Sequence, residues 1–162
     1  MGIFAKMDLS EVKIMGKGNY FTPGEYLVEV LNTKSNQGGY KGDSIILEFE
    51  VLGSEGEEAA PAGEHRDHVL IIGGADKQRS DSGLGDFMAF LCVCFGVDSP
   101  KSLSKEEWDE LATSVIQDNA LKGEVLRLSC FMTKTKKEKD FTVHKYLRLA
   151  TEEDIARFIP AE

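Results

Sequence analysis

The sequence predicts a mainly β protein, in which five strands form a small barrel and two helices are inserted between the third and fourth strands. Three observations carry this prediction. Several short segments alternate apolar and polar side chains with a period of two, as half-buried strands do. Two segments between the third and fourth of these have helical spacing of apolar residues instead. The resulting order of three strands, two helices and two strands fits a small Greek-key barrel.

Length and composition favour one domain, because 162 residues that are 41% hydrophobic can bury a sizeable core. We place this domain at residues 1–150, with an N-terminal arm over 1–21, and assign 151–162 to a C-terminal tail or short helix. No segment is apolar for long enough to be a signal peptide or a membrane span, so we expect a cytoplasmic protein. The three cysteines then indicate buried apolar groups and no disulfide framework.

The first three strands are separated by clear loop signals. Thr22-Pro23-Gly24 is a turn signal, and the first strand follows over 25–32. A glycine-rich loop over 33–43 leads to the second strand over 44–52. An acidic linker over 53–63 then precedes the third strand, over 64–72.

The two inserted helices differ in character. The segment over 84–95 is apolar on nearly every side and is followed by Gly96, a residue typical of helix C-termini. A helix of this composition must be buried over most of its surface. The second helix, over 105–117, begins with a capping box of Ser104 and Glu107 and repeats its apolar residues at the helical period.

A closing hairpin over 124–149 joins the last two strands through a lysine-rich tip. Residues 131–148 carry a net charge of +4, whereas the whole chain carries −9, so the remainder carries −13. A general polyanion binder would be basic overall. Local concentration of basic charge instead suggests a groove that holds a charged backbone while the rest of the surface repels it. The alternative is a solvated tip whose lysines protect it from edge pairing.

This order of elements is the topology of the oligonucleotide/oligosaccharide-binding barrel. In that fold ligands lie across strands two and three, flanked by the loop between the first two strands and the loop between the last two. Here those loops are 33–43 and 133–140, and both contain lysines. The competing fold is an open α+β sandwich with the helices on one face of the sheet.

Over residues 22–149 the chain also resembles a known family. The stretch FTPGEYLVEVLNTKSNQGGYKGDSIILEFEVLGSEG, followed by a polar strand, a helix ending in Phe95-Gly96-Val97 and a closing hairpin, is similar to small phage-encoded early proteins. Members of that family sit among replication and recombination genes and are regarded as single-stranded DNA-binding proteins. The resemblance therefore implies such a protein in the cytoplasm of a bacterial host. The lysine-rich tip and the acidic 53–63 insertion are not characteristic of the family.

Binding of single-stranded nucleic acid requires cations that follow the phosphates and aromatic faces on which bases stack. Tyr40 is the leading candidate, because a loop of glycine and lysine has no reason to bury a phenol. His144, Tyr146 and Arg148 alternate onto one polar face of the last strand, which we interpret as functional. The candidate nucleic-acid-binding residues are Lys34, Tyr40, Lys41, Phe131, Lys134, Lys136, Lys137, Lys139, His144, Tyr146 and Arg148.

The C-terminal segment TEEDIARFIPAE supports two interpretations. Single-strand binders of bacteria and phages often end in an acidic tail with hydrophobic residues that docks replication or recombination proteins. On that interpretation the docking residues are Asp154, Ile155, Phe158 and Ile159. On the other, Thr151 and Asp154 cap a short helix that closes the barrel and buries Ile155 and Phe158.

Little in the sequence points to catalysis. The chain contains no phosphate loop, no serine elbow and no zinc-spaced cysteine set. His65 and His68 would point to opposite faces of a strand, so a shared metal is not expected. We therefore predict no enzyme activity, no cofactor and no metal.

Three functions fit these observations. The first is a phage-type protein that coats or protects single-stranded DNA in replication or recombination, with RNA as a related ligand. The second is a non-catalytic protein of the same fold that binds a replication or host protein, and the third is a virion or structural β protein. Strand edges over 25–32 and 44–52 would also allow pairing between copies of the chain.

Overall fold

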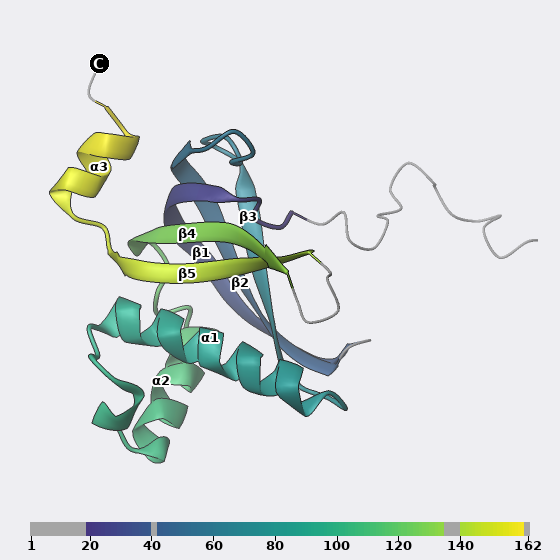
Figure 1. The fold of residues 1–162 in the computed structure, drawn as a ribbon. Helices are drawn as coiled ribbons and strands as arrows, with labels where there is room; N and C mark the ends of the chain where they lie inside the picture. Colours follow the sequence, from purple (N-terminus) through teal and green to yellow (C-terminus); the bar gives the residue numbers. More distant parts are fainter. Residues whose placement is uncertain (1–18, 40–41, 135–139, 161–162) are drawn as a thin grey trace, which may run out of the picture.

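The structure, a computed structural model, describes residues 19–39, 42–134 and 140–160. Its centre is a five-stranded antiparallel sheet in the order β3-β2-β1-β4-β5 (Figure 1). The strands are β1 (Gly24–Gly39), β2 (Gly42–Glu55), β3 (His65–Gly73), β4 (Val125–Lys134) and β5 (Asp140–Leu149). Between β3 and β4 lie α1 (Lys77–Phe95), the short 3-10 helix η2 (Pro100–Ser102) and α2 (Lys105–Gln117), and α3 (Glu152–Phe158) follows β5. The predicted five strands and the helical insertion are therefore confirmed.

The sheet is open, whereas the sequence predicted a barrel. β3 and β5 are its two edges and are not hydrogen-bonded neighbours. Part of the β3 edge is occupied by the chain just before β1: Tyr20 forms a parallel bridge with Asp67, whose amide donates to the carbonyl of Asn19 at 2.6 Å. An extended segment therefore uses backbone groups that a closing strand would need. The expectation of a mainly β protein was also wrong, because helices of 19, 13 and 7 residues make the fold mixed α/β.

β1 is long and bent. It pairs with β4 only from Gly24 to Glu29 but with β2 along its whole length, and its register against β2 shifts at Leu27/Val28 and again at Val30/Asn32. Such irregularities bend a strand and increase its twist. In a flat sheet the β1–β2 and β4–β5 hairpins would end on opposite sides, since β4 runs antiparallel to the first half of β1. In the curved sheet both hairpins extend toward the right of Figure 1.

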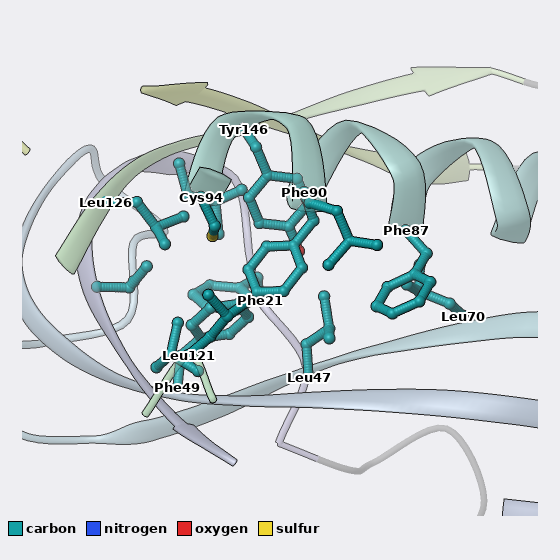
Figure 2. Close-up of a cluster of buried hydrophobic side chains, with 14 of the residues drawn as sticks. Phe21, Leu47, Phe49, Leu70, Phe87, Phe90, Cys94, Leu121, Leu126 and Tyr146 are labelled. Carbon is teal, nitrogen blue, oxygen red and sulfur yellow. The ribbon is translucent and has the colours of Figure 1, made fainter. Parts of the chain in front are cut away.

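The core lies between α1 and the face of the sheet that we call the inner face. Figure 2 shows Phe87, Phe90 and Cys94 pointing from α1 toward strand residues such as Phe49. α1 approaches β3 closely at Gly83, where an added Cβ would lie 1.8 Å from the carbonyl oxygen of Ile71. The helix begins at Lys77, earlier than predicted, because Asp76 caps it by accepting a hydrogen bond from the Arg79 amide.

α3 packs against the opposite, outer face of the sheet. Thr151 and Asp154 form the predicted capping box, and Asp154 and Phe158 are buried. The prediction that Ile155 is buried was wrong, since Ile155 and Ile159 are each 44% exposed. The C-terminal segment is therefore a docked helix rather than a free tail.

An ionic cluster fastens α3 to the sheet. Asp154 accepts two hydrogen bonds from the guanidinium of Arg148, at 2.6 and 3.0 Å, and lies 3.8 Å from Nε of the buried Arg127. The bonds from Arg148 hold the pKa of the Asp154 carboxyl well below its usual range. The Arg127 guanidinium also stacks on the Phe158 ring, with 4.8 Å to the centroid.

One further expectation concerns the burial of the cysteines. Cys94 and Cys130 are buried, and burial raises the pKa of each thiol to about 12, so both behave as apolar groups.

Among the helices in the described ranges, none has the length and apolar character needed to cross a bilayer.

Candidate nucleic-acid interface

The outer face of the β4–β5 hairpin exposes two aromatic rings. β1 pairs with β4 no further than Cys130, so the rest of the hairpin continues as a two-stranded ribbon. Phe131 stands opposite Val143, and Phe141 stands opposite Thr133, which places the two phenylalanines diagonally on one face. Their side chains are 45% and 53% exposed. We call Phe131, Val143 and Phe141 the aromatic platform.

One lysine flanks this platform. Lys145 stands opposite Ser129 and shares the outer face with Val143, because residues two apart in a strand point the same way. Lys134 ends β4 on the other face of the ribbon, where it stands opposite Asp140, and both lysines are exposed. A surface that combines exposed rings with ammonium groups can stack bases and contact phosphates together.

The structure brings only some of the predicted residues to this surface. Phe131 lies on it, whereas Lys134, three residues further along β4, points to the other face of the ribbon. Lys34 does not: it lies on β1, and its ammonium pairs with Glu48 of β2 at 2.9 Å. The other predicted residues of the two loops lie outside the described residues: Tyr40, Lys41, Lys136, Lys137 and Lys139.

The prediction that His144, Tyr146 and Arg148 share one polar face of β5 was wrong for Arg148. Tyr146 is buried against the core and pairs with Leu128, whereas Arg148 pairs with Arg127 on the outer face. The cause is an irregularity in register between Arg127 and Leu128, where β5 has one residue more than β4. Such a bulge reverses which alternate residues face inward. Arg148 is exposed, but its guanidinium is engaged by Asp154.

Sequence reasoning missed Phe141 and Lys145 for the same reason. The alternation of Phe141, Val143, Leu147 and Leu149 indicated an inward apolar face, and the irregularity divides that set. The signal that could have found Phe141 is its place beside the tip of a long hairpin, where no helix remains to cover it.

On the inner side of the same hairpin, aromatic side chains link β5 to β3. His144 stacks on His68 with 3.6 Å between ring centroids and 12° between planes, and the Tyr146 hydroxyl lies 2.6 Å from Nδ1 of His68. Burial lowers the pKa of His144 to about 4 and lowers that of His68 strongly, and it raises the pKa of Tyr146. These rings are therefore neutral at ordinary pH and are not available for stacking on bases.

The outer face of β1, β2 and β3 is acidic. Glu48 stands opposite Asp67, and Glu29 opposite Glu50, so two like-charged pairs face each other across neighbouring strands. Like charges in such positions are unfavourable, and they also repel phosphates. The expectation that a nucleic acid lies across the second and third strands is therefore not supported by the charges on this face.

No protein-family model matches the chain, and no curated protein matches it at a significant level. The likeness to small phage early proteins therefore rests on the residue patterns alone, and the function it implies stays a prediction. Within residues 19–39, 42–134 and 140–160, no three His, Cys, Asp or Glu side chains are grouped so that they could hold a metal ion.

Proposed function

We propose that this chain is a non-catalytic, phage-type single-stranded DNA-binding protein that holds DNA on the outer face of its β4–β5 hairpin. The observation that carries the proposal is the exposure of Phe131 and Phe141 on one face of a basic hairpin in an acidic chain. Exposed apolar rings that lie together on one face are typical of a binding surface. Each base stacked on such a ring contributes roughly 1–3 kcal/mol.

The charge distribution favours this surface over the others. Residues 131–148 carry +4 and the remaining residues −13, so a polyanion is attracted to the hairpin and repelled elsewhere.

We further propose that the fold is a variant of the oligonucleotide-binding barrel whose last seam is not closed. The strand order is the one such a barrel would have without pairing between β3 and β5. The segment Asn19–Tyr20 on the β3 edge supplies a reason for the difference.

The proposal is tested by the affinity for fluorescently labelled oligothymidylate, measured by anisotropy at low and high salt. We expect Phe131→Ala and Phe141→Ala each to weaken binding about 5- to 150-fold, which corresponds to the loss of one stacked base. Leu84→Ala is the matched control, because Leu84 is 47% exposed on α1 and far from the hairpin in sequence. If the two phenylalanine variants bind oligothymidylate as tightly as the control does, the aromatic platform is not the DNA-binding surface.

Salt dependence tests Lys145 separately. Each phosphate contact on a single strand contributes a slope of about −0.7 in log affinity against log salt. Lys145→Gln should therefore flatten the slope by about 0.7. Exchange of Lys105, an exposed lysine at the start of α2, for glutamine should leave the slope unchanged. If Lys145→Gln also has the slope of the unaltered protein, Lys145 does not contact DNA.

A protein-interaction role is the second candidate, favoured by the acidic outer face of β1, β2 and β3. On this alternative the opposed pairs Glu48/Asp67 and Glu29/Glu50 meet a cationic surface of a replication or host protein. Absence of any salt-dependent affinity for oligothymidylate would favour this candidate over the first.

A further inference from the structure

The two edges of the open sheet are joined by side chains where backbone hydrogen bonds are absent. His68 of β3 and His144 of β5 stack face to face, with their ring centroids 3.6 Å apart, although their strands are not hydrogen-bonded neighbours. Tyr146 of β5 adds the hydroxyl contact to His68 at 2.6 Å. The ring of Phe21, from the segment that enters β1, packs edge-on against His144 at 5.9 Å. We call His68, His144 and Tyr146 the seam cluster.

The seam cluster lies directly behind the aromatic platform. His144 separates Val143 from Lys145 in the chain, and it pairs with Cys130, the neighbour of Phe131. A displacement of β5 at His144 must therefore also move Val143, which stands opposite Phe131. The position of the platform consequently depends on whether the two imidazoles stay stacked.

We infer that the His68–His144 stack is a proton-sensitive latch that holds β5 against β3 and thereby fixes the aromatic platform for DNA binding. Stacked neutral imidazoles attract each other, whereas two imidazolium rings at this distance repel strongly in a buried site. Nε2 of His144 is buried and has no hydrogen-bond partner among the described residues, so a proton placed there would be buried without an acceptor. Protonation therefore favours an opened seam.

The groups around the cluster give little compensation for a positive charge. From α1, Asp86 and Cys94 act on Tyr146, and from β4 Cys130 does so. Both thiols have raised pKa values and stay neutral, and burial also raises the pKa of Asp86. The segment before β1 contributes the apolar Phe21 ring. On β3 and β5 themselves, Arg66 pairs with Glu64, and Lys145 lies on the opposite face from His144.

The latch is tested by NMR on the whole chain, with histidine ring signals and amide exchange followed from about pH 8, above the usual histidine pKa, to about pH 4. We expect amide protection in β5 to fall over the pH range in which His144 takes up a proton, before the core of β1 and β2 opens. His144→Phe keeps a ring for stacking and removes the titrating group, so its β5 protection should persist to lower pH. His65→Phe is the matched control, because it removes an exposed imidazole from β3, the strand that carries His68.

Two results would overturn the inference. One is protonation of His144 in the unaltered protein with β5 protection unchanged, a measurement that needs no variant. The other is loss of β5 protection at the same pH in His144→Phe as in the unaltered protein.

The link to DNA rests on the proposed function and has its own measurement. If oligothymidylate binds at neutral pH, its affinity should fall at least about fivefold where β5 protection is lost, and His144→Phe should abolish this fall. A fall of equal size in His144→Phe would contradict the coupling. If oligothymidylate does not bind at neutral pH, the proposed function fails, while the exchange data still decide whether the latch exists.

Discussion

Phe158→Ala should destabilise the whole domain, because α3 is part of its packed structure. The Phe158 ring is 8% exposed and lies between the guanidinium groups of Arg127 and Arg157, each 4.8 Å from its centroid. The sheet approaches it closely: a Cβ added at Gly53 would lie 2.8 Å from the Cβ of Phe158.

The expected loss follows from burial. Truncation of a buried phenylalanine to alanine costs about 3–5 kcal/mol, and a ring packed partly against guanidinium groups belongs near the lower value. We therefore expect the free energy of unfolding to fall by about 3 kcal/mol, which corresponds to a melting temperature about 6–12 °C lower in a chain of this size. Ile155→Ala is the matched control in the same helix, because Ile155 is 44% exposed. Its effect should be about 0.5 kcal/mol or less.

Urea unfolding followed by fluorescence is a suitable assay. Trp108 is the only tryptophan, and it is buried in α2, which lies far from α3 in Figure 1. A shift of its unfolding midpoint in Phe158→Ala would therefore show that α3 is coupled to the whole domain. If the midpoint moves no further than in Ile155→Ala, α3 is a separable tail and the reasoning from burial is refuted.

Three further outcomes follow from the same structure. Gly83→Ala should lower the melting temperature because its Cβ would overlap the Ile71 carbonyl oxygen at 1.8 Å, whereas Gly85→Ala meets nothing within 4 Å and should stabilise α1 by up to about 1 kcal/mol. Because the pKa of His144 is lowered to about 4, the unfolded chain binds a proton below about pH 6.5 that the folded chain does not. The free energy of unfolding, measured with urea, should thus fall by roughly 3 kcal/mol between about pH 6.5 and pH 4, and His144→Phe should reduce this fall. Asp154→Asn should lower the free energy of unfolding by about 2 kcal/mol at neutral pH. The lowered pKa of Asp154 stabilises the fold fully only above the usual aspartate range, so the difference between the variant and the unaltered protein should shrink as the pH falls below that range.

The sequence was sufficient to predict elements whose signals are local. The strand periods, the capping box at Ser104 and the capping box at Thr151 depend on residues within a few positions of each other, and all appear in the structure. The lysine-rich hairpin was likewise predicted as a unit. Its inward face was not, because a single extra residue in β5 reverses the alternation between Tyr146 and Arg148.

The open sheet had a similarly non-local cause. Part of the β3 edge is occupied by Asn19, whose carbonyl accepts from the Asp67 amide, a contact between an arm without strand periodicity and a strand far along the chain. The acidic outer face was also hidden in the sequence, since Glu48 and Asp67 become neighbours only through the register of β2 and β3. Pairings between strands, rather than propensities within them, decided where sequence reasoning failed.

The contacts of Phe21 limit how early this part of the core can fold during synthesis on the ribosome. Its ring packs against Tyr26 and Phe49, which are synthesised soon after it, and against His144, which emerges almost at the end. The contacts of Phe21 are therefore complete only after His144 has been synthesised. Contacts of such long sequence separation slow folding. A nascent chain halted before β5 would leave the Phe21 ring packed on Tyr26 and Phe49 but without its contact to His144.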